Sequence, residues 1–209
     1  MASVFFDLDG VVIRSRGRDK AFLWQADLQA KLGIGPAVTA ALFRQPRWNE
    51  ILCGRQGFRD HLRLAFDAAR VTCSPDAFIE FWLANDLDWY TGVLELAEHL
   101  KASGHQLFIA TNQDALRSAH IRQQPAVARL FDDVLTSADL GVCKPSVEFY
   151  TAVRRRLLLS SDAECIVVDD GQQNIEAAAS VGWRGIRFDP DLLASHTPEY
   201  LASEIRSLL

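Results

Sequence analysis

The chain begins with a short apolar run that ends in two aspartates and a glycine. Residues 4–6 are apolar, and Asp7, Asp9 and Gly10 follow them. A buried parallel strand cannot carry charge in its middle, but its carboxyl end can present charge to a crevice. Gly10 allows the backbone to turn there, so we expect both carboxylates to reach one ligand. Taken alone, the same residues are also compatible with a plain acidic turn.

Short apolar runs and helical patterns alternate through the second half of the chain. The runs typical of buried strands are 106–110, 133–135, 165–168 and 185–188. The helical patterns are 93–103, 114–122 with 127–130, 146–159 and 174–181. Strands that alternate with helices form a parallel sheet covered on both faces. We therefore expect an α/β fold with a doubly wound, Rossmann-like parallel sheet.

One long segment interrupts this alternation. It contains no convincing strand, and Ser74 with Pro75 is a typical helix start. Its helical patterns are 21–32, 37–43, 58–69 and 75–85. We expect an all-helical cap over residues 15–88, inserted into an α/β core made of residues 1–14 and 89–209. Most of its aromatic residues should form the cap's own core; they include Trp24, Trp48, Phe78, Phe81 and Trp82.

Composition excludes several classes of partner. The net charge is −5 and there is no basic run, which argues against binding to nucleic acid. No apolar stretch is long enough to cross a membrane, and because the first strand starts within three residues of Met1 we expect no signal peptide. The cysteines lie far apart without a CxxC pair, so we expect reduced thiols in a cytoplasmic protein. Oligomeric state stays open.

Polar residues stand where each expected strand ends. Each group alone has a plain alternative as a turn, a helix cap or a surface residue. Four such groups at successive strand ends indicate one site, because these ends meet at the same edge of a parallel sheet. The groups are Asp7 with Asp9, Thr111 with Asn112, Lys144 with Pro145, and Asp169 with Asp170.

Phosphoryl transfer explains why these residue types would gather. A carboxylate such as Asp7 can attack phosphorus and form an aspartyl-phosphate. Asp7, Asp169 and Asp170 bring three negative charges and a phosphate about two more, whereas Lys144 offsets only one. A divalent cation is therefore required, and carboxylate oxygens are the ligands that Mg²⁺ prefers.

The remaining groups have matching tasks. The hydroxyl of Thr111 and the amide of Asn112 would donate hydrogen bonds to phosphate oxygens. Asp9 would act as general acid toward the leaving alkoxide and then as general base toward water.

The four groups, in this order and spacing, resemble the motifs of the haloacid dehalogenase superfamily, on its phosphatase side. The resemblance implies a mobile cap, Asp7 as nucleophile and Asp9 as acid and base. It also implies that Thr111 and Lys144 hold the phosphoryl group. The implied Mg²⁺ ligands are Asp7, the backbone oxygen of Asp9, and Asp170, with Asp169 beside them. More narrowly, residues 137–175 resemble small sugar-phosphate phosphatases of the glucose-1-phosphatase type.

Two departures from the family pattern matter. Dehalogenases of the superfamily lack the second aspartate, so Asp9 argues against cleavage of a carbon–halogen bond. Asn174 stands where many relatives carry a third acid, which leaves open whether Asp169 ligates the metal directly. We expect a phosphatase acting on a small phosphorylated metabolite, with a sugar phosphate as the leading substrate. The alternatives are a phosphomutase or phosphotransferase and a catalytically silent sensor of a phosphorylated metabolite.

The cap is expected to select the substrate. Trp48 would stack on a sugar ring, and Asn49 or Glu50 would bond its hydroxyls. Some of the arginines at the first linker and around Trp48 would lie over the substrate; the candidates are Arg14, Arg16, Arg18, Arg44, Arg47 and Arg55. The competing interpretation is a solvated helical face with a core tryptophan.

Overall fold

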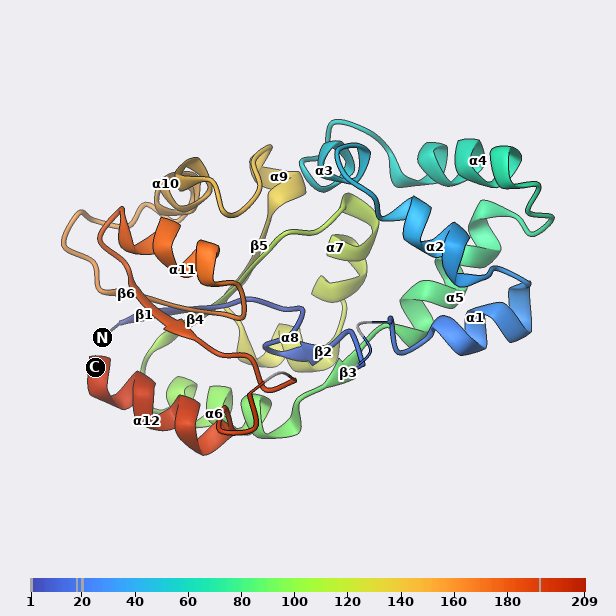
Figure 1. Ribbon diagram of the computed structural model, residues 1–209. Helices are drawn as coiled ribbons and strands as arrows, with labels where there is room; N and C mark the ends of the chain where they lie inside the picture. The colour runs from blue at the N-terminus through green and yellow to red at the C-terminus, as the bar shows by residue number, and fades with distance from the viewer. Residues whose placement is uncertain (1, 18, 20, 192) are drawn as a thin grey trace.

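The computed structural model describes residues 2–17, 19, 21–191 and 193–209, and its centre is a five-stranded sheet (Figure 1). The strand order is β5-β4-β1-β6-β7, and neighbouring strands run parallel. The chain builds the β4 and β5 side first and then crosses β1 to add the other side. The strands are β1 (Ser3–Phe6), β4 (Gln106–Thr111), β5 (Asp133–Thr136), β6 (Cys165–Asp169) and β7 (Arg184–Arg187).

Alternate side chains of the central strand pack into two separate hydrophobic layers. Val4 and Phe6 pack with helices on one face of the sheet, and Phe5 packs with helices on the other (Figure 1). A strand buried on both faces is apolar throughout, and this confirms the expected doubly wound α/β architecture. The first layer contains α6 (Thr91–Ala102), α8 (Pro125–Leu130) and α12 (Pro198–Leu208), and the second contains α10 (Val147–Arg156) and α11 (Gln172–Ala179).

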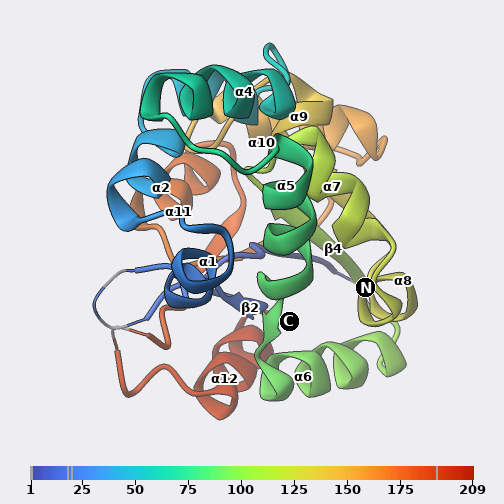
Figure 2. The ribbon, with the colours of Figure 1, turned by 90° about the vertical axis from the view of Figure 1, so that its right-hand side faces the viewer.

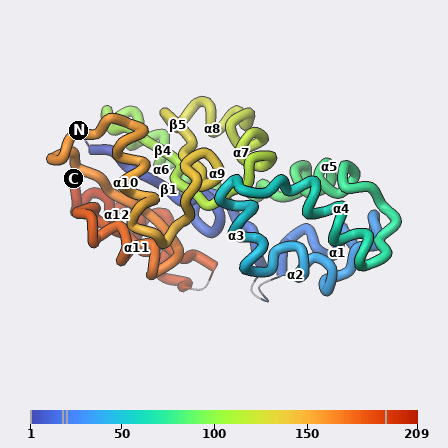
Figure 3. Tube along the Cα trace, turned by 90° about the horizontal axis from the view of Figure 1, so that it is seen from above, coloured from blue at the N-terminus to red at the C-terminus, as the bar shows by residue number. Residues whose placement is uncertain are grey.

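A group of helices with its own hydrophobic cluster lies beyond the carboxyl edge of the sheet (Figures 1 and 3). We refer to this group of helices as the cap. That the cap comprises residues 15–88 stays a proposal. The linkers into and out of the cap pair as antiparallel β2 (Ile13–Arg14) and β3 (Asp88–Trp89). The helices are α1 (Gln25–Leu32), α2 (Pro36–Leu42), α3 (Arg47–Leu52), α4 (Phe58–Ala69) and α5 (Pro75–Asn85). Figure 2 shows them from the cap side.

Side-chain caps fix several helix starts. Ser74 accepts a hydrogen bond from the N–H of Ala77 at the start of α5, as its sequence pattern predicts. Asp114 caps α7 (Ala115–Arg122) and Thr136 caps α9 (Ser137–Leu140) in the same way. The short helices α3 and α9 and the C-terminal helix α12 were not expected from the sequence.

The expectation of reduced cysteines is wrong for one pair. Cys53 of the cap and Cys143 of the core are joined by a disulfide, with Cα atoms 5.9 Å apart. Cys73 and Cys165 are free. The pairing had no local signal, because the two residues are separated by 90 positions. Among the described residues, no helix has the length and apolar character needed to span a bilayer.

Candidate active site

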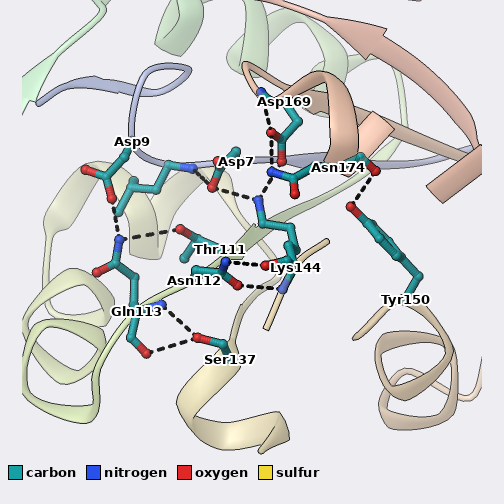
Figure 4. Close-up of polar contacts among 12 residues, drawn as sticks. Asp7, Asp9, Thr111, Asn112, Gln113, Ser137, Lys144, Tyr150, Asp169 and Asn174 are labelled. Atoms are coloured by element: carbon teal, nitrogen blue, oxygen red, sulfur yellow. Dashed lines mark hydrogen bonds and ion pairs between the residues drawn. The ribbon is translucent and has the colours of Figure 1, made fainter. Parts of the chain in front are cut away.

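The polar strand ends meet at the carboxyl edge of the sheet (Figure 4). Asp7 follows β1, Thr111 ends β4 and Asp169 ends β6, and β1 lies between the other two strands. All three side chains are buried. Lys144 reaches the same place from the loop between α9 and α10, where its bond to Pro145 is cis. The structure thus brings together residues from all four predicted groups.

Lys144 bridges two of the carboxylates. Its Nζ lies 3.0 Å from Oδ1 of Asp7 and 2.6 Å from Oδ2 of Asp169, and its side chain is only 2% exposed. Burial alone would lower the pKa of Lys144, but the two carboxylates raise it above its usual value. Lys144 therefore supplies a permanent positive charge beside Asp7.

Asn112 has a different partner from the one expected. Its Nδ2 donates to the carbonyl of Lys144 at 2.9 Å, and its Oδ1 accepts from the N–H of Lys144 at 2.8 Å. Both ends of the amide thus hold the Lys144 backbone, and a contact between this side chain and a phosphate stays a prediction. Asn112 fixes the loop from which the lysine reaches Asp7.

The positive charge near the Asp7 carboxyl is too small to keep this group fully ionised at neutral pH. Its Oδ1 accepts the N–H of Leu8 at 2.8 Å in addition to the contact with Lys144. Burial, helped by the charges of Asp169 and Asp170, raises the pKa of Asp7 to about 7 despite Lys144. A carboxyl with this pKa is a poor nucleophile at neutral pH unless a further cation stabilises its charge. The electrostatics thus agree with the charge count made from the sequence.

Three carboxylates could hold that cation. Asp7, Asp169 and Asp170 have oxygens within 4.8 Å of one another. Asp169 already uses both of its oxygens: Oδ2 contacts Lys144, and Oδ1 accepts from the N–H of Gly171 at 2.8 Å and from Asn174 at 2.7 Å. Asp7 and Asp170 are therefore better suited as direct metal ligands, and Asp169 as the residue that orients Lys144.

Gly10 provides the space that Asp170 occupies. Its φ is +82°, and a Cβ atom built there would lie 2.8 Å from Oδ2 of Asp170. A side chain would therefore displace this carboxylate as well as strain the turn. Burial, together with the charge of Asp169, raises the pKa of Asp170 to about 6. The donor set fits a hard divalent cation such as Mg²⁺, which favours carboxylate oxygens.

Asp9 has buried partners that sequence reasoning missed. Arg117 donates to both of its oxygens, at 2.7 and 2.9 Å, and Gln113 donates to Oδ2 (Figure 4 shows the Gln113 contact). Burial acts to raise the pKa of Asp9, but the charge and hydrogen bonds of Arg117 hold it below the usual value. Spacing offered a signal, because Arg117, Ser118 and Ile121 share the buried face of α7.

A cavity of about 240 Å³ adjoins Asp9 on the cap side. Asp9 and Arg117 border it from the core, and Asp86 borders it from the end of α5. Ser15 and Arg16 come from the first linker, and the guanidinium of Arg16 lies over the ring of Phe22. The remaining lining is aromatic and consists of Phe22, Phe43, Trp48 and Trp82.

The cap residues expected to contact substrate are only partly at this cavity. Trp48 and Arg16 border it, whereas Arg44, Arg47 and Asn49 are exposed and not part of its lining. Other expected residues pair elsewhere: Arg55 with Glu50, and Arg14 with Asp88 and Asp191. Arg18 lies outside the described residues. The cavity is therefore more aromatic and less cationic than the sequence indicated.

Comparison with protein families gives one match over most of the chain. A model of haloacid dehalogenase-like hydrolases matches residues 1–182. The chain belongs to this family. This haloacid dehalogenase-like hydrolase is 35% identical to a sesquiterpene phosphatase of Aspergillus oryzae over 97 residues, which are 46% of this chain and 49% of the relative. It spans about half or less of the curated relatives it matches.

Solved structures share the fold of this hydrolase. A family enzyme of Bacteroides thetaiotaomicron, in complex with magnesium and inorganic phosphate, has a TM-score of 0.72 at 17% identity and covers 90% of this chain and 94% of its own. The L-2-haloacid dehalogenase of Xanthobacter autotrophicus has a TM-score of 0.65 at 19% identity, covering 98% and 88%. At these identities the likeness concerns the fold alone.

Proposed function

We propose that the protein is a Mg²⁺-dependent phosphomonoesterase that acts on a small phosphorylated metabolite through an aspartyl-phosphate. The observation that carries the proposal is the contact of the Lys144 ammonium with Asp7, beside Asp170 and Thr111. This arrangement offers a carboxylate nucleophile, a fixed cation for phosphate oxygens and a second acidic ligand for a metal. Catalysis of phosphoryl transfer consists almost entirely of such positioning and charge stabilisation.

The residues divide the reaction into two steps. In the first, a carboxylate oxygen of Asp7 bonds to phosphorus while the bond to the leaving alcohol breaks, and Asp9 donates a proton to that alcohol. In the second, Asp9 accepts a proton from water, whose oxygen bonds to phosphorus and releases Asp7. Lys144 and the Thr111 hydroxyl would hold the phosphoryl oxygens in both steps.

The proton inventory agrees with this division. Arg117 keeps Asp9 in the carboxylate form, which is the base required for the second step. The proton for the first step would arrive on the monoanionic form of the substrate, whose second pKa is near 6, and would pass to the Asp9 carboxylate, which then donates it to the leaving alcohol.

Asp7, Asp170 and the backbone oxygen of Asp9 are the proposed ligands of Mg²⁺. The bound cation would offset the charge of the phosphoryl group and keep Asp7 ionised. The magnesium and phosphate in the Bacteroides enzyme support this assignment, as does the space that Gly10 leaves for Asp170.

Two other activities are less well supported. A haloacid dehalogenase shares the fold, but Asp9, with its buried arginine partner, has no task in attack on a carbon–halogen bond. A silent sensor would likewise have no use for an acid and base residue beside the nucleophile. A phosphomutase remains the alternative, since it needs the same residues and differs only in the acceptor of the phosphoryl group.

The cavity beside Asp9 bears on the leaving alcohol. A sugar phosphate, including the glucose-1-phosphatase type of substrate, stays the prediction from the sequence, and Trp48 at the cavity supports it. Four of the nine residues that border the cavity are aromatic, and they favour a second candidate, a phosphate ester of an apolar alcohol, because burying apolar surface against these rings is favourable. The name of the Aspergillus relative, a sesquiterpene phosphatase, supports the second candidate.

A cytoplasmic location is part of the proposal, and one observation weighs against it. The disulfide between Cys53 and Cys143 is unusual for a compartment in which glutathione and thioredoxin keep thiols reduced.

Phosphate release from a panel of substrates tests the proposed function. The panel contains sugar phosphates and prenyl monophosphates, each with Mg²⁺ and with chelator, for the wild type and for Asp7→Asn. We expect metal-dependent release that the substitution abolishes, and the ranking of the panel decides between the two alcohols. Release of phosphate by Asp7→Asn at the wild-type rate would contradict the proposal.

A further inference from the structure

We propose that Arg117 is a positioning residue that aligns the Asp9 carboxylate for its proton transfers only while the cap is docked on the core. The inference rests on the proposed function, because it gives Arg117 a task in the same two-step reaction. Arg117 belongs to core helix α7, whereas its second acidic partner, Asp86, follows α5 of the cap. A chain of charges thus runs from the acid and base residue, which is partly exposed, through buried Arg117 to buried Asp86 in the cap.

The contact with Asp9 fixes the orientation of its carboxylate. Nη1 of Arg117 donates to Oδ2 at 2.7 Å, and Nη2 donates to Oδ1 at 2.9 Å. Two parallel hydrogen bonds of this kind restrict rotation as well as position, which a point charge such as lysine cannot do. The Arg117 side chain is 4% exposed and that of Asp9 is 33% exposed, so the guanidinium is shielded from water while the carboxylate still faces the cavity.

The other edge of the guanidinium faces the cap. Nε of Arg117 lies 2.5 Å from Oδ2 of Asp86 as an ion pair, without the alignment of a hydrogen bond. Oδ1 of Asp86 accepts from Nε1 of Trp24 at 2.6 Å. Trp24 precedes the first cap helix and Asp86 follows the last, so both ends of the cap meet at this carboxylate. The ring of Trp82 lies against the guanidinium.

Docking of the cap therefore affects the orientation of the Asp9 carboxylate through the guanidinium of Arg117. With the cap docked, Arg117 is held between two carboxylates in a dry environment, where charge pairs are strong. If the cap moved away, Asp86 would leave with it and water would reach the guanidinium, which weakens and loosens the bidentate contact. The cavity beside Asp9 is bordered by all three residues, so closing the cavity and aligning Asp9 are one event.

A purely structural ion pair makes a different prediction from a positioning residue. With p-nitrophenyl phosphate, the bond from Asp7 to phosphorus forms while nitrophenolate leaves without a proton, so the first step does not need Asp9. The second step does, because Asp9 must take the proton of the attacking water. Loss of alignment should slow only the second step, whereas general damage to the fold slows both.

Rapid-quench kinetics with p-nitrophenyl phosphate and Mg²⁺ separates the two steps. In Asp86→Asn and Arg117→Lys we expect a burst of nitrophenolate within about threefold of the wild-type rate, followed by phosphate release slowed on the order of 100-fold. The phosphorylated enzyme should accumulate. The matched control is Asp88→Asn at the same linker, where an exposed aspartate pairs with Arg14, and we expect wild-type behaviour in both steps.

Every outcome bears on the inference. Parallel loss of both steps, or no change in either variant, overturns it while leaving the proposed function in place. A wild type that releases no phosphate overturns the proposed function and the inference with it. Circular dichroism checks the fold of each variant; if only one folds, that variant decides. If neither folds, Arg117 is a structural residue and the inference is wrong.

Discussion

Reduction of the disulfide between Cys53 and Cys143 should lower the stability of the protein substantially. The bond joins residues 90 positions apart, so it closes a long loop in the unfolded chain. The loop-closure relation gives about 4.6 kcal/mol at 25 °C for a loop of this length. In a domain of this size each kcal/mol shifts Tm by about 2–4 °C. We therefore expect full reduction to lower Tm by about 9–18 °C.

Thermal unfolding with and without a phosphine reductant measures this effect, with alkylation and mass spectrometry to count thiols. We expect two alkylated cysteines before reduction and four after it. Cys53→Ser should behave like the reduced protein, and Cys73→Ser, which removes a free thiol of the cap, should behave like the oxidised wild type. Four reactive thiols without reductant, or a Tm change below about 2 °C on full reduction, would refute the reasoning.

Three further predictions concern single side chains. Lys144→Met leaves the Asp7 and Asp169 carboxylates without their buried cation, so we expect loss of turnover and about 3–5 kcal/mol of stability in denaturant titrations; wild-type stability would contradict this. Gly10→Ala displaces Asp170, so turnover should require roughly tenfold more Mg²⁺ in a metal titration, and an unchanged Mg²⁺ dependence would contradict this. Burial raises the pKa of Asp86 to about 6, so the folded state binds this proton more tightly than the unfolded chain does. Lowering the pH from 8 to 5 should therefore stabilise the wild type relative to Asp86→Asn by on the order of 1 kcal/mol, measured by unfolding at both pH values, and an equal response of both proteins would contradict this.

The sheet and the nucleophile could be predicted because their signals are local. A strand buried on both faces must be apolar, and a charged residue can follow it only at its end. Asp7 and Asp169 obey this rule, and strand pairing then brings them together without further information. The family resemblance added the expected roles of these residues. The family model that matches residues 1–182 confirms the family.

The partners of the Asp9 carboxylate could not be predicted from local sequence signals. Arg117 and Asp86 are charged residues in helical segments, where exposure is the usual outcome. Their burial depends on the contact between the cap and the core, which no local pattern encodes. The four-residue spacing of Arg117 and Ile121 is that of one helix face, but only the structure shows that this face is buried and that Arg117 meets Asp9 and Asp86.

The side chains that the cap contributes to the site were the hardest part of the structure to predict from the sequence. Its helices follow from periodicity and from starts such as Ser74, but the side chains that border the cavity depend on how five short helices pack. Arg44 and Arg47 lie near Trp48 in sequence, yet only Trp48 borders the cavity. The disulfide between Cys53 and Cys143 likewise depends on packing between the cap and the core, because it forms where the end of α3 meets the loop before Lys144.

The central claim is that Asp7 becomes phosphorylated. Acid quench during turnover with Mg²⁺, followed by peptide mass spectrometry, tests it directly. We expect one phosphoryl group on the peptide that contains Asp7, absent from Asp7→Asn and absent when chelator replaces the metal. Steady turnover without that adduct, or an adduct on a peptide that lacks Asp7, would contradict the account.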